Sequence, residues 1–259
     1  MSKTVCITFD DGLHDQYEYA FNALKKYGLS GVFYITTSTI GLENQSVFLY
    51  KTINQDELTE IHSNKMMEIG AHGVKHKNTI DEINQSVDCL KKMLNINKNI
   101  GFASPESEIC DINFPNKDLL KNVSYIRTSV KVRRNGFFYS CMYAANILIK
   151  SKRLFYELNK KYLMKPNAFK GKVPLLESVA IKKSTPLSHI QYLISHSPED
   201  SIIVLCFHSV LPESKEKTNW WYGYKDFCRL CKWLNEQQKN SVVTKRLIDL
   251  VEEANNDNN

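Results

Sequence analysis

Near its N-terminus the chain reads Val5-Cys6-Ile7-Thr8-Phe9-Asp10-Asp11-Gly12, an apolar run that ends in two carboxylates and a glycine. β-Branched and aromatic residues bounded by a turn signal predict a strand over residues 5–9. Adjacent carboxylates repel each other and resist burial unless a cation or hydrogen-bond donors hold them. This stretch therefore predicts either a functional site at a strand end or a plain Asp-Gly turn with solvated carboxylates.

Short strand-like runs alternate with helix-length segments along the whole chain. The expected strands are residues 5–9, 31–36, 68–71, 100–103, 125–130, 176–181, 202–207 and 242–243. The expected helices are residues 15–27, 55–67, 79–95, 151–163, 186–195 and 224–238. Such alternation predicts an α/β fold of parallel strands covered by helices, and about eight strands favour a closed barrel over an open doubly wound sheet.

The length and composition are those of one globular domain. The 259 residues contain 42% apolar and 24% charged residues, which excludes collagen-like, coiled-coil and disordered chains. No repeat, linker or compositional break divides the chain, so we expect one domain over residues 1–253 and a disordered tail over residues 254–259. A chain of this size folds without a structural metal, so any bound metal needs a functional reason.

The charge is mildly basic, with 34 Lys and Arg against 28 Asp and Glu and a net charge of +6. The surplus is scattered, so no nucleic-acid partner is expected, and peripheral contact with anionic lipid at the inner membrane face is the minority interpretation. No run is apolar enough for a signal peptide or a membrane span, and seven cysteines, an odd number, suit reduced thiols. We therefore expect a cytoplasmic protein.

Two histidines follow the third expected strand, in the segment Glu68-Ile-Gly-Ala-His72-Gly-Val-Lys-His76. If residues 72–76 form one turn, both imidazoles face one point, as two ligands of a divalent metal must. This spacing also arises by chance, and each histidine could be a hydrogen-bonded helix cap. Because the carboxylate pair ends another strand of the same alternating fold, an Asp-His-His metal site is the better interpretation.

A further histidine ends the apolar run Ile202-Ile-Val-Leu-Cys-Phe-His208. A core histidine with satisfied hydrogen bonds is the ordinary interpretation. At the edge that also carries the carboxylates, His208 would instead act as a proton donor and complete an acid and base pair. We prefer this functional interpretation.

Three motifs in order resemble those of the polysaccharide deacetylase (NodB-homology) family, carbohydrate esterase family 4. They are Thr8-Phe-Asp-Asp-Gly12, the segment His72–His76 and Leu205-x-x-His208. The resemblance implies a distorted (β/α) barrel of about seven to eight parallel strands. It also implies a metal-dependent hydrolase that removes an N-acyl group, acetyl or formyl, from an amino sugar.

The resemblance assigns roles to individual residues. It implies metal binding by Asp11, His72 and His76, with Asp10 as general base, His208 as general acid and Leu205 in the pocket for the acyl methyl group. Zinc is the default ion for such ligands, and cobalt, nickel and iron are alternatives. The missing export signal favours a cytoplasmic nucleotide- or lipid-linked glycan precursor as the substrate.

The sequence departs from the family pattern in several places. Gly73 stands where Ser or Thr usually braces the loop. The third motif resembles Phe102-Ala-Ser-Pro105-Glu-Ser107, which places Pro105 beside the substrate but contains no arginine to steady the catalytic aspartate. Arg127, on the next strand, is a candidate for the missing charge and for contact with substrate. No fourth motif is recognisable, which weakens the assignment of a substrate.

Two more residues are candidates for substrate contact. Trp221, in the aromatic segment 219–224, either stacks on a sugar or fastens the next helix to the barrel. His14, just past Asp10-Asp11-Gly12, either faces the substrate or lies on the surface.

Three other functions compete with deacylation. The branch with a Phe-Ala-x-Pro motif suggests a cyclic-amide or ureide hydrolase, and two histidines with one carboxylate are also the facial triad of non-haem iron oxygenases. The altered motifs suggest a non-catalytic glycan-binding barrel. Nothing in the sequence indicates an oligomeric state.

Overall fold

The computed structural model describes residues 2–42, 51–107, 117–129, 150–213 and 220–256. Seven parallel strands pair in sequence order, and β1 also pairs with β7, which closes a barrel. These strands are β1 (Lys3–Phe9), β2 (Gly31–Ile35), β3 (Met67–Ala71), β4 (Ile100–Ala103), β5 (Val123–Ser129), β6 (Leu175–Ala180) and β7 (Ile202–Phe207). The predicted (β/α) barrel is confirmed.

Three short strands add to the barrel. β10 (Val242–Thr244) pairs in parallel with the start of β1, with Lys3 opposite Val242. β8 (Ser209–Leu211) and β9 (Trp221–Gly223) form a separate parallel pair just beyond β7, which was not predicted. All eight predicted strands are present, with boundaries within two residues of those expected.

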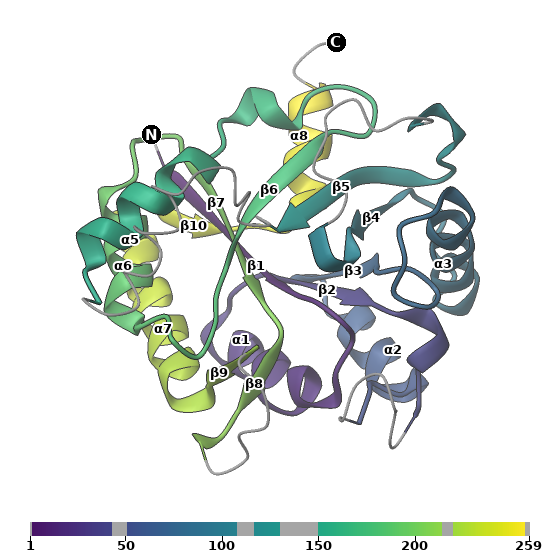
Figure 1. The fold of residues 1–259 in the computed structure, drawn as a ribbon, viewed down its shortest axis with the longest axis horizontal. Coiled ribbons are helices and arrows are strands. Elements are labelled where there is room, and N and C mark those ends of the chain that lie inside the picture. Colours follow the sequence, from purple (N-terminus) through teal and green to yellow (C-terminus); the bar gives the residue numbers. More distant parts are fainter. Residues whose placement is uncertain (1, 43–50, 108–116, 130–149, 214–219, 257–259) are drawn as a thin grey trace, which may run out of the picture.

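Helices surround the barrel (Figure 1). They are η1 (Gln16–Phe21, a π-helix), α1 (Asn22–Tyr27), α2 (Gln55–Ser63), α3 (Ile80–Met93), α5 (Lys152–Asn159), α6 (Leu187–His196), α7 (Tyr224–Gln237) and α8 (Leu247–Asn256). Short 3-10 turns are η2 (Thr37–Thr39), η3 (Pro105–Ser107), η4 (Lys117–Leu119), η5 (Lys160–Tyr162), η6 (Pro166–Phe169) and η8 (Gln238–Asn240). No helix in the described ranges is long and apolar enough to cross a bilayer.

Helix α8 corrects the predicted domain boundary. It continues to Asn256, three residues beyond the expected end of the ordered domain at 253. Ala254 is buried, and the Asn255 side chain accepts a hydrogen bond of 3.1 Å from the backbone N–H of Gly171. These contacts hold the end of the helix on the barrel. Residues 257–259, the rest of the predicted tail, lie outside the described residues.

Strand alternation divides the core into two layers. On β1, Val5, Ile7 and Phe9 belong to the large cluster between the sheet and the helices, whereas Cys6 belongs to a second cluster inside the barrel. Apolar residues of α8 pack in this inner cluster. The carboxyl ends of the strands lie at the other end of the barrel, where the chemistry-bearing residues follow β1, β3 and β7.

Candidate active site

Asp11, His72 and His76 converge at this edge of the barrel. Their ligand atoms all lie within 4.8 Å of one another. The Asp11 Oδ1 is 3.4 Å from the Nε2 of His72 and 3.3 Å from the Nε2 of His76. Two imidazole nitrogens and one carboxylate oxygen form a donor set that divalent transition metals accept, and three protein ligands leave positions open for water and substrate. The residues therefore fit the metal that the motifs predict.

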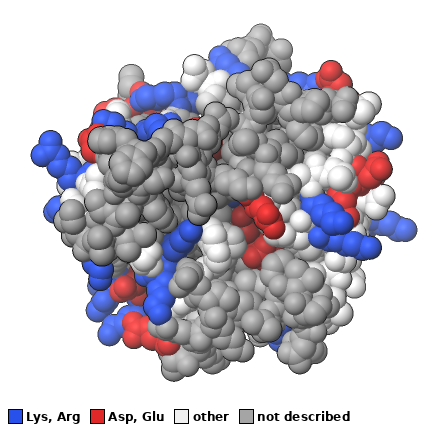
Figure 2. Space-filling model, viewed as in Figure 1, with Lys and Arg blue, Asp and Glu red and all other residues white. Residues whose placement is uncertain are grey.

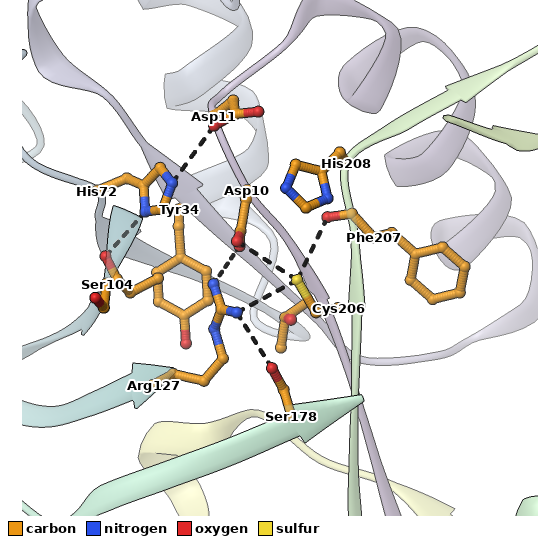
Figure 3. A network of polar contacts seen from close by, with 12 residues as sticks. Asp10, Asp11, Tyr34, His72, Ser104, Arg127, Ser178, Cys206, Phe207 and His208 are labelled. Atoms are coloured by element: carbon orange, nitrogen blue, oxygen red, sulfur yellow. Dashed lines mark hydrogen bonds and ion pairs between the residues drawn. The ribbon is translucent and has the colours of Figure 1, made fainter. Parts of the chain in front are cut away.

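A second hydrogen bond aims His72 at this point. Its Nδ1 lies 2.9 Å from the carbonyl oxygen of Ala103, at the end of β4. Because the Nδ1–H donates to that carbonyl, the lone pair belongs to Nε2, which faces Asp11 (Figure 3). Burial opposes ionisation of Asp11, but its contacts with the imidazoles of His72 and His76 lower the pKa of its carboxyl below the ordinary value. The same contact raises the pKa of His76 against the effect of burial.

The loop between the two histidines explains the glycine at position 73. Gly73 has φ +82°, and a Cβ there would lie 2.8 Å from the backbone oxygen of Lys77, so a side chain does not fit. The loop is braced instead by Glu82 of α3, which accepts hydrogen bonds of 2.8 and 2.7 Å from the backbone N–H groups of Val74 and Lys75. Glu82 therefore supplies the bracing expected from a Ser or Thr.

Arg127 supplies the positive charge that the third motif lacks. Its Nη2 forms an ion pair with Oδ1 of Asp10, and its Nη1 donates to the Ser178 hydroxyl at 3.2 Å. The Arg127 side chain is fully buried beneath Asp10 (Figure 3). Burial alone would raise the pKa of Asp10, but the Arg127 guanidinium, assisted by His72 and His208, lowers it. Arg127 is thus a positioning residue for Asp10, and its side chain has no exposed surface.

The position of Leu205 corrects another prediction. Leu205 is fully buried in the cluster between the sheet and the helices. The next residue, Cys206, points into the barrel, where its Sγ lies 3.4 Å from Oδ2 of Asp10 and 3.3 Å from Nη1 of Arg127. Because successive strand residues face opposite sides, Cys206 rather than Leu205 lies against the site.

His208 lies opposite His72, on the other side of Asp10 (Figure 3). Burial lowers the pKa of its imidazole, and the charges of Asp11 and Asp10 oppose this shift. Among the described residues, its Nδ1 has no hydrogen-bond partner.

Two polar residues of the first loop, missed by sequence reasoning, hold the catalytic backbone. The fully buried Gln16 donates from Nε2 to the carbonyl oxygens of both Asp10 and His208, the latter at 3.2 Å. Asp15 accepts a hydrogen bond of 3.0 Å from the backbone N–H of Val210, just beyond His208. Burial raises the pKa of Asp15 to about 7. The only signal for either residue was its closeness to Asp10-Asp11-Gly12 in the chain.

The predicted substrate contacts have mixed outcomes. Trp221 is only 4% exposed, whereas its neighbour Trp220 is 43% exposed and has its ring centroid 4.8 Å from that of His208. Trp221 is therefore a packing residue, and the exposed ring beside the site is that of Trp220. His14 lies 2.9 Å from a carboxylate oxygen of Glu57, so it pairs with α2 instead of joining the metal-site residues.

Pro105 lies in the turn after β4 and is buried. Its carbonyl accepts a hydrogen bond of 2.9 Å from the Asn78 side chain, which fastens this turn to the segment that follows His76. Its contact with substrate stays a prediction.

The face shown in Figure 2 has a central hollow in which acidic side chains are visible. Basic side chains lie on two sides of this hollow.

Comparison with known proteins supports the resemblance over the N-terminal part of the chain. Residues 1–114 match the family model described as polysaccharide deacetylase. Over 82 residues the chain is 34% identical to the putative polysaccharide deacetylase YxkH of Bacillus subtilis (strain 168). The matched segment covers 31% of this chain and 24% of that protein. The match thus spans about a quarter of the length of that relative.

Solved structures resemble the chain over most of its length. The Xyl-CE4 domain of a multidomain xylanase, from the hindgut metagenome of Trinervitermes trinervoides, has 14% identity and a TM-score of 0.47, covering 98% of this chain and 91% of that one. A mutant of the peptidoglycan deacetylase PdaC from Bacillus subtilis has 13% identity and a TM-score of 0.47, with the same coverage.

Proposed function

We propose that this protein, whose residues 1–114 match the polysaccharide deacetylase family, is a metal-dependent hydrolase that removes an acetyl or formyl group from an amino sugar. One observation carries the proposal. The Asp11-His72-His76 cluster lies beside Asp10, which Arg127 holds ionised, and His208 lies on the other side of that carboxylate. A binding protein has no need for a charged carboxylate buried at this cost.

In this proposal Asp10 is the general base. A divalent ion at Asp11, His72 and His76, for which we propose zinc, would polarise the acyl carbonyl and lower the pKa of a bound water. Asp10 accepts the proton of the attacking water as its oxygen bonds to the acyl carbon. The lowered pKa of Asp10 keeps it unprotonated, and Arg127 fixes its direction.

His208 completes the reaction as general acid. The carbon–nitrogen bond breaks as the imidazolium gives its proton to the departing nitrogen, so the products are a carboxylic acid and a free amine. Burial disfavours the imidazolium, and the carboxylates of Asp10 and Asp11 favour it. Gln16 donates hydrogen bonds to the backbone carbonyl oxygens of both Asp10 and His208. These bonds keep the proposed base and acid at a fixed separation.

We also propose that the enzyme works in the cytoplasm on a nucleotide- or lipid-linked glycan precursor. The support is chemical: the cysteines that the described ranges contain are free thiols, including the buried Cys6, Cys206 and Cys231. Reduced thiols are typical of a reducing compartment.

The test is release of acetate or formate from a panel of acylated amino sugars by the wild type and by Asp10→Asn. We expect a loss of about 10²-fold to 10⁴-fold in kcat for the variant, with metal content unchanged. Asp118→Asn, which alters an aspartate whose side chain is 93% exposed, is the control and should keep full activity. The proposal fails if Asp10→Asn hydrolyses the true substrate as fast as the wild type.

A further inference from the structure

Trp220 lies beside His208, and Lys182 lies against Trp220; neither residue has a part in the mechanism above. The ring centroids of Trp220 and His208 are 4.8 Å apart, with an angle of 48° between the planes. The Lys182 Nζ lies 3.8 Å from the centroid of the same indole ring. Trp220 therefore contacts both the proposed general acid and a cation, and at 43% exposure it also presents aromatic surface to solvent.

The barrel itself brings Lys182 to this place. β6 ends at Ala180, which pairs with Cys206 of β7, and the backbone N–H of Ile181 donates to the Cys206 carbonyl at 2.8 Å. Lys182 follows directly, and its own N–H donates to the Thr185 hydroxyl at 3.2 Å. Lys182 thus starts from the same edge of the barrel as His208, on the neighbouring strand.

The charge of Lys182 lacks a counterion within the described part of the chain. Its side chain is half-buried, and burial lowers the pKa of its amine. Its contact with Trp220 is to an aromatic face, and no described carboxylate forms an ion pair with it. A partly desolvated ammonium without a counterion is costly in free energy. A ligand that places an anionic group against the Lys182 ammonium would therefore bind more tightly.

We propose that Trp220 and Lys182 form a substrate subsite for an amino sugar that carries an anionic group, either a phosphate or a carboxylate. The inference rests on the deacylase function proposed above, because His208 marks where the amide nitrogen lies. The sugar packs against the exposed indole of Trp220. Its anionic group accepts a charge-assisted hydrogen bond from Lys182.

The neighbouring lysine offers a matched control. Lys183 is exposed, and its Nζ lies 5.2 Å from the ring centroid of Trp221, which is buried. Lys183 carries the same charge one residue away but lies over the ring of the packing tryptophan, Trp221. A general effect of positive charge would therefore depend on both lysines, whereas the subsite depends on Lys182.

The test measures dissociation constants by isothermal titration calorimetry on the full chain. The ligands are N-acetylglucosamine, the same sugar phosphorylated at its anomeric oxygen, and N-acetylmuramic acid, which carries a carboxylate. The proteins are the wild type, Lys182→Gln, Lys182→Arg and Lys183→Gln, each checked for an unchanged Tm. A preference for one charged ligand identifies phosphate or carboxylate as the anionic group.

We expect the wild type to bind one charged sugar about tenfold more tightly than the neutral one. Lys182→Gln should remove this advantage, Lys182→Arg should keep most of it, and Lys183→Gln should leave it intact. Trp220→Ala should weaken binding of charged and neutral sugars together, since it removes the shared packing surface.

The subsite is refuted if the wild type binds charged and neutral sugars equally or binds none of them. It is also refuted if the advantage survives in Lys182→Gln or disappears equally in Lys183→Gln. These results are distinct from failure of the deacylase proposal, because acetate release from a neutral sugar would uphold the hydrolase without this subsite.

Discussion

Asp10 and Glu68 are both buried carboxylates inside the barrel, at 4% and 6% exposure, and they lie at its opposite ends. Asp10 has a cation, Arg127, against it. Glu68 instead accepts hydrogen bonds from the Tyr125 hydroxyl and, at 3.0 Å, from the backbone N–H of Ile248 in α8. The pKa of Asp10 is consequently lowered, whereas burial raises that of Glu68 to about 7.

The difference shows what a carboxylate needs to stay charged in this interior. At Glu68 two hydrogen-bond donors and the charge of Arg246, which is not in contact, do not offset the loss of hydration, whereas at Asp10 a guanidinium in contact does. The end with the arginine can hold a base ready at neutral pH. The end closed by α8 holds a carboxyl that suits structure and not catalysis.

Two tyrosines connect the ends. The Tyr34 and Tyr125 hydroxyls are 2.9 Å apart, and the Arg127 guanidinium carbon lies 4.9 Å from the centroid of the Tyr34 ring. Glycines make room for both rings, since a Cβ on Gly70 would lie 2.5 Å from Tyr34 and one on Gly101 would lie 2.1 Å from Tyr125. A polar column from Glu68 through both tyrosines and Arg127 to Asp10 thus runs through the apolar inner cluster.

Removing the arginine should have the largest effect on stability. Arg127→Met leaves Asp10 buried without its cation, and we expect the free energy of unfolding to fall by about 3 to 5 kcal/mol in urea denaturation. Arg229→Met removes an arginine whose side chain is 59% exposed and paired with Asp226, and should change stability by less than about 1 kcal/mol. Equal losses in the two variants would show that Arg127 is not compensating a buried charge.

The raised pKa of Glu68 should make stability depend on pH. The folded protein holds this proton up to a pH of about 7, while the unfolded chain loses it near 4.5, so the folded state binds more protons between these values. The contribution of Glu68 to stability is therefore full below 4.5 and falls by about 3 kcal/mol as pH rises to 7.

Unfolding free energies of the wild type and Glu68→Gln, compared across this pH range, test the shift. The wild type should lose stability relative to the variant as pH rises. Glu236→Gln, an exposed control, should follow the wild type. A constant difference between wild type and Glu68→Gln would mean that Glu68 titrates as in an unfolded chain.

A smaller effect is expected where a glycine makes room for the column. Gly101→Ala pushes on the Tyr125 ring and should cost about 1 to 3 kcal/mol by thermal denaturation. Gly223→Ala, whose new Cβ would meet only Trp221 at 3.8 Å, should cost less. The packing explanation is wrong if the two substitutions are equally tolerated.

The sequence predicted the barrel and the five central site residues for one physical reason. Parallel strands leave their carboxyl ends at one edge, so polar residues that end different strands must meet there. Asp10, Asp11, His72, His76 and His208 all obey this rule. Arg127 was found by asking which nearby strand could replace a missing charge, and the structure confirms its contact with Asp10.

The errors at the candidate site concern the face on which a side chain lies. Leu205 was chosen where Cys206 faces the site, and Trp221 where Trp220 does. Within a strand a shift of one residue moves a side chain to the opposite face, and a motif position gives no direct view of that face. Helix α8 was missed because its polar end, Asn255 and Asn256, resembles a tail in composition.

The end of the barrel that holds Arg127 is also the end where we propose the metal site. Metal content per chain tests this proposed site most directly. Elemental analysis would compare the wild type, His72→Ala and the exposed-site control His62→Ala, all purified identically without chelator. We predict about one zinc, cobalt, nickel or iron ion per chain in the wild type and the control, and none in His72→Ala. A wild type that holds no metal after dialysis against divalent ions, or a His72→Ala variant that holds as much as the wild type, would contradict the account.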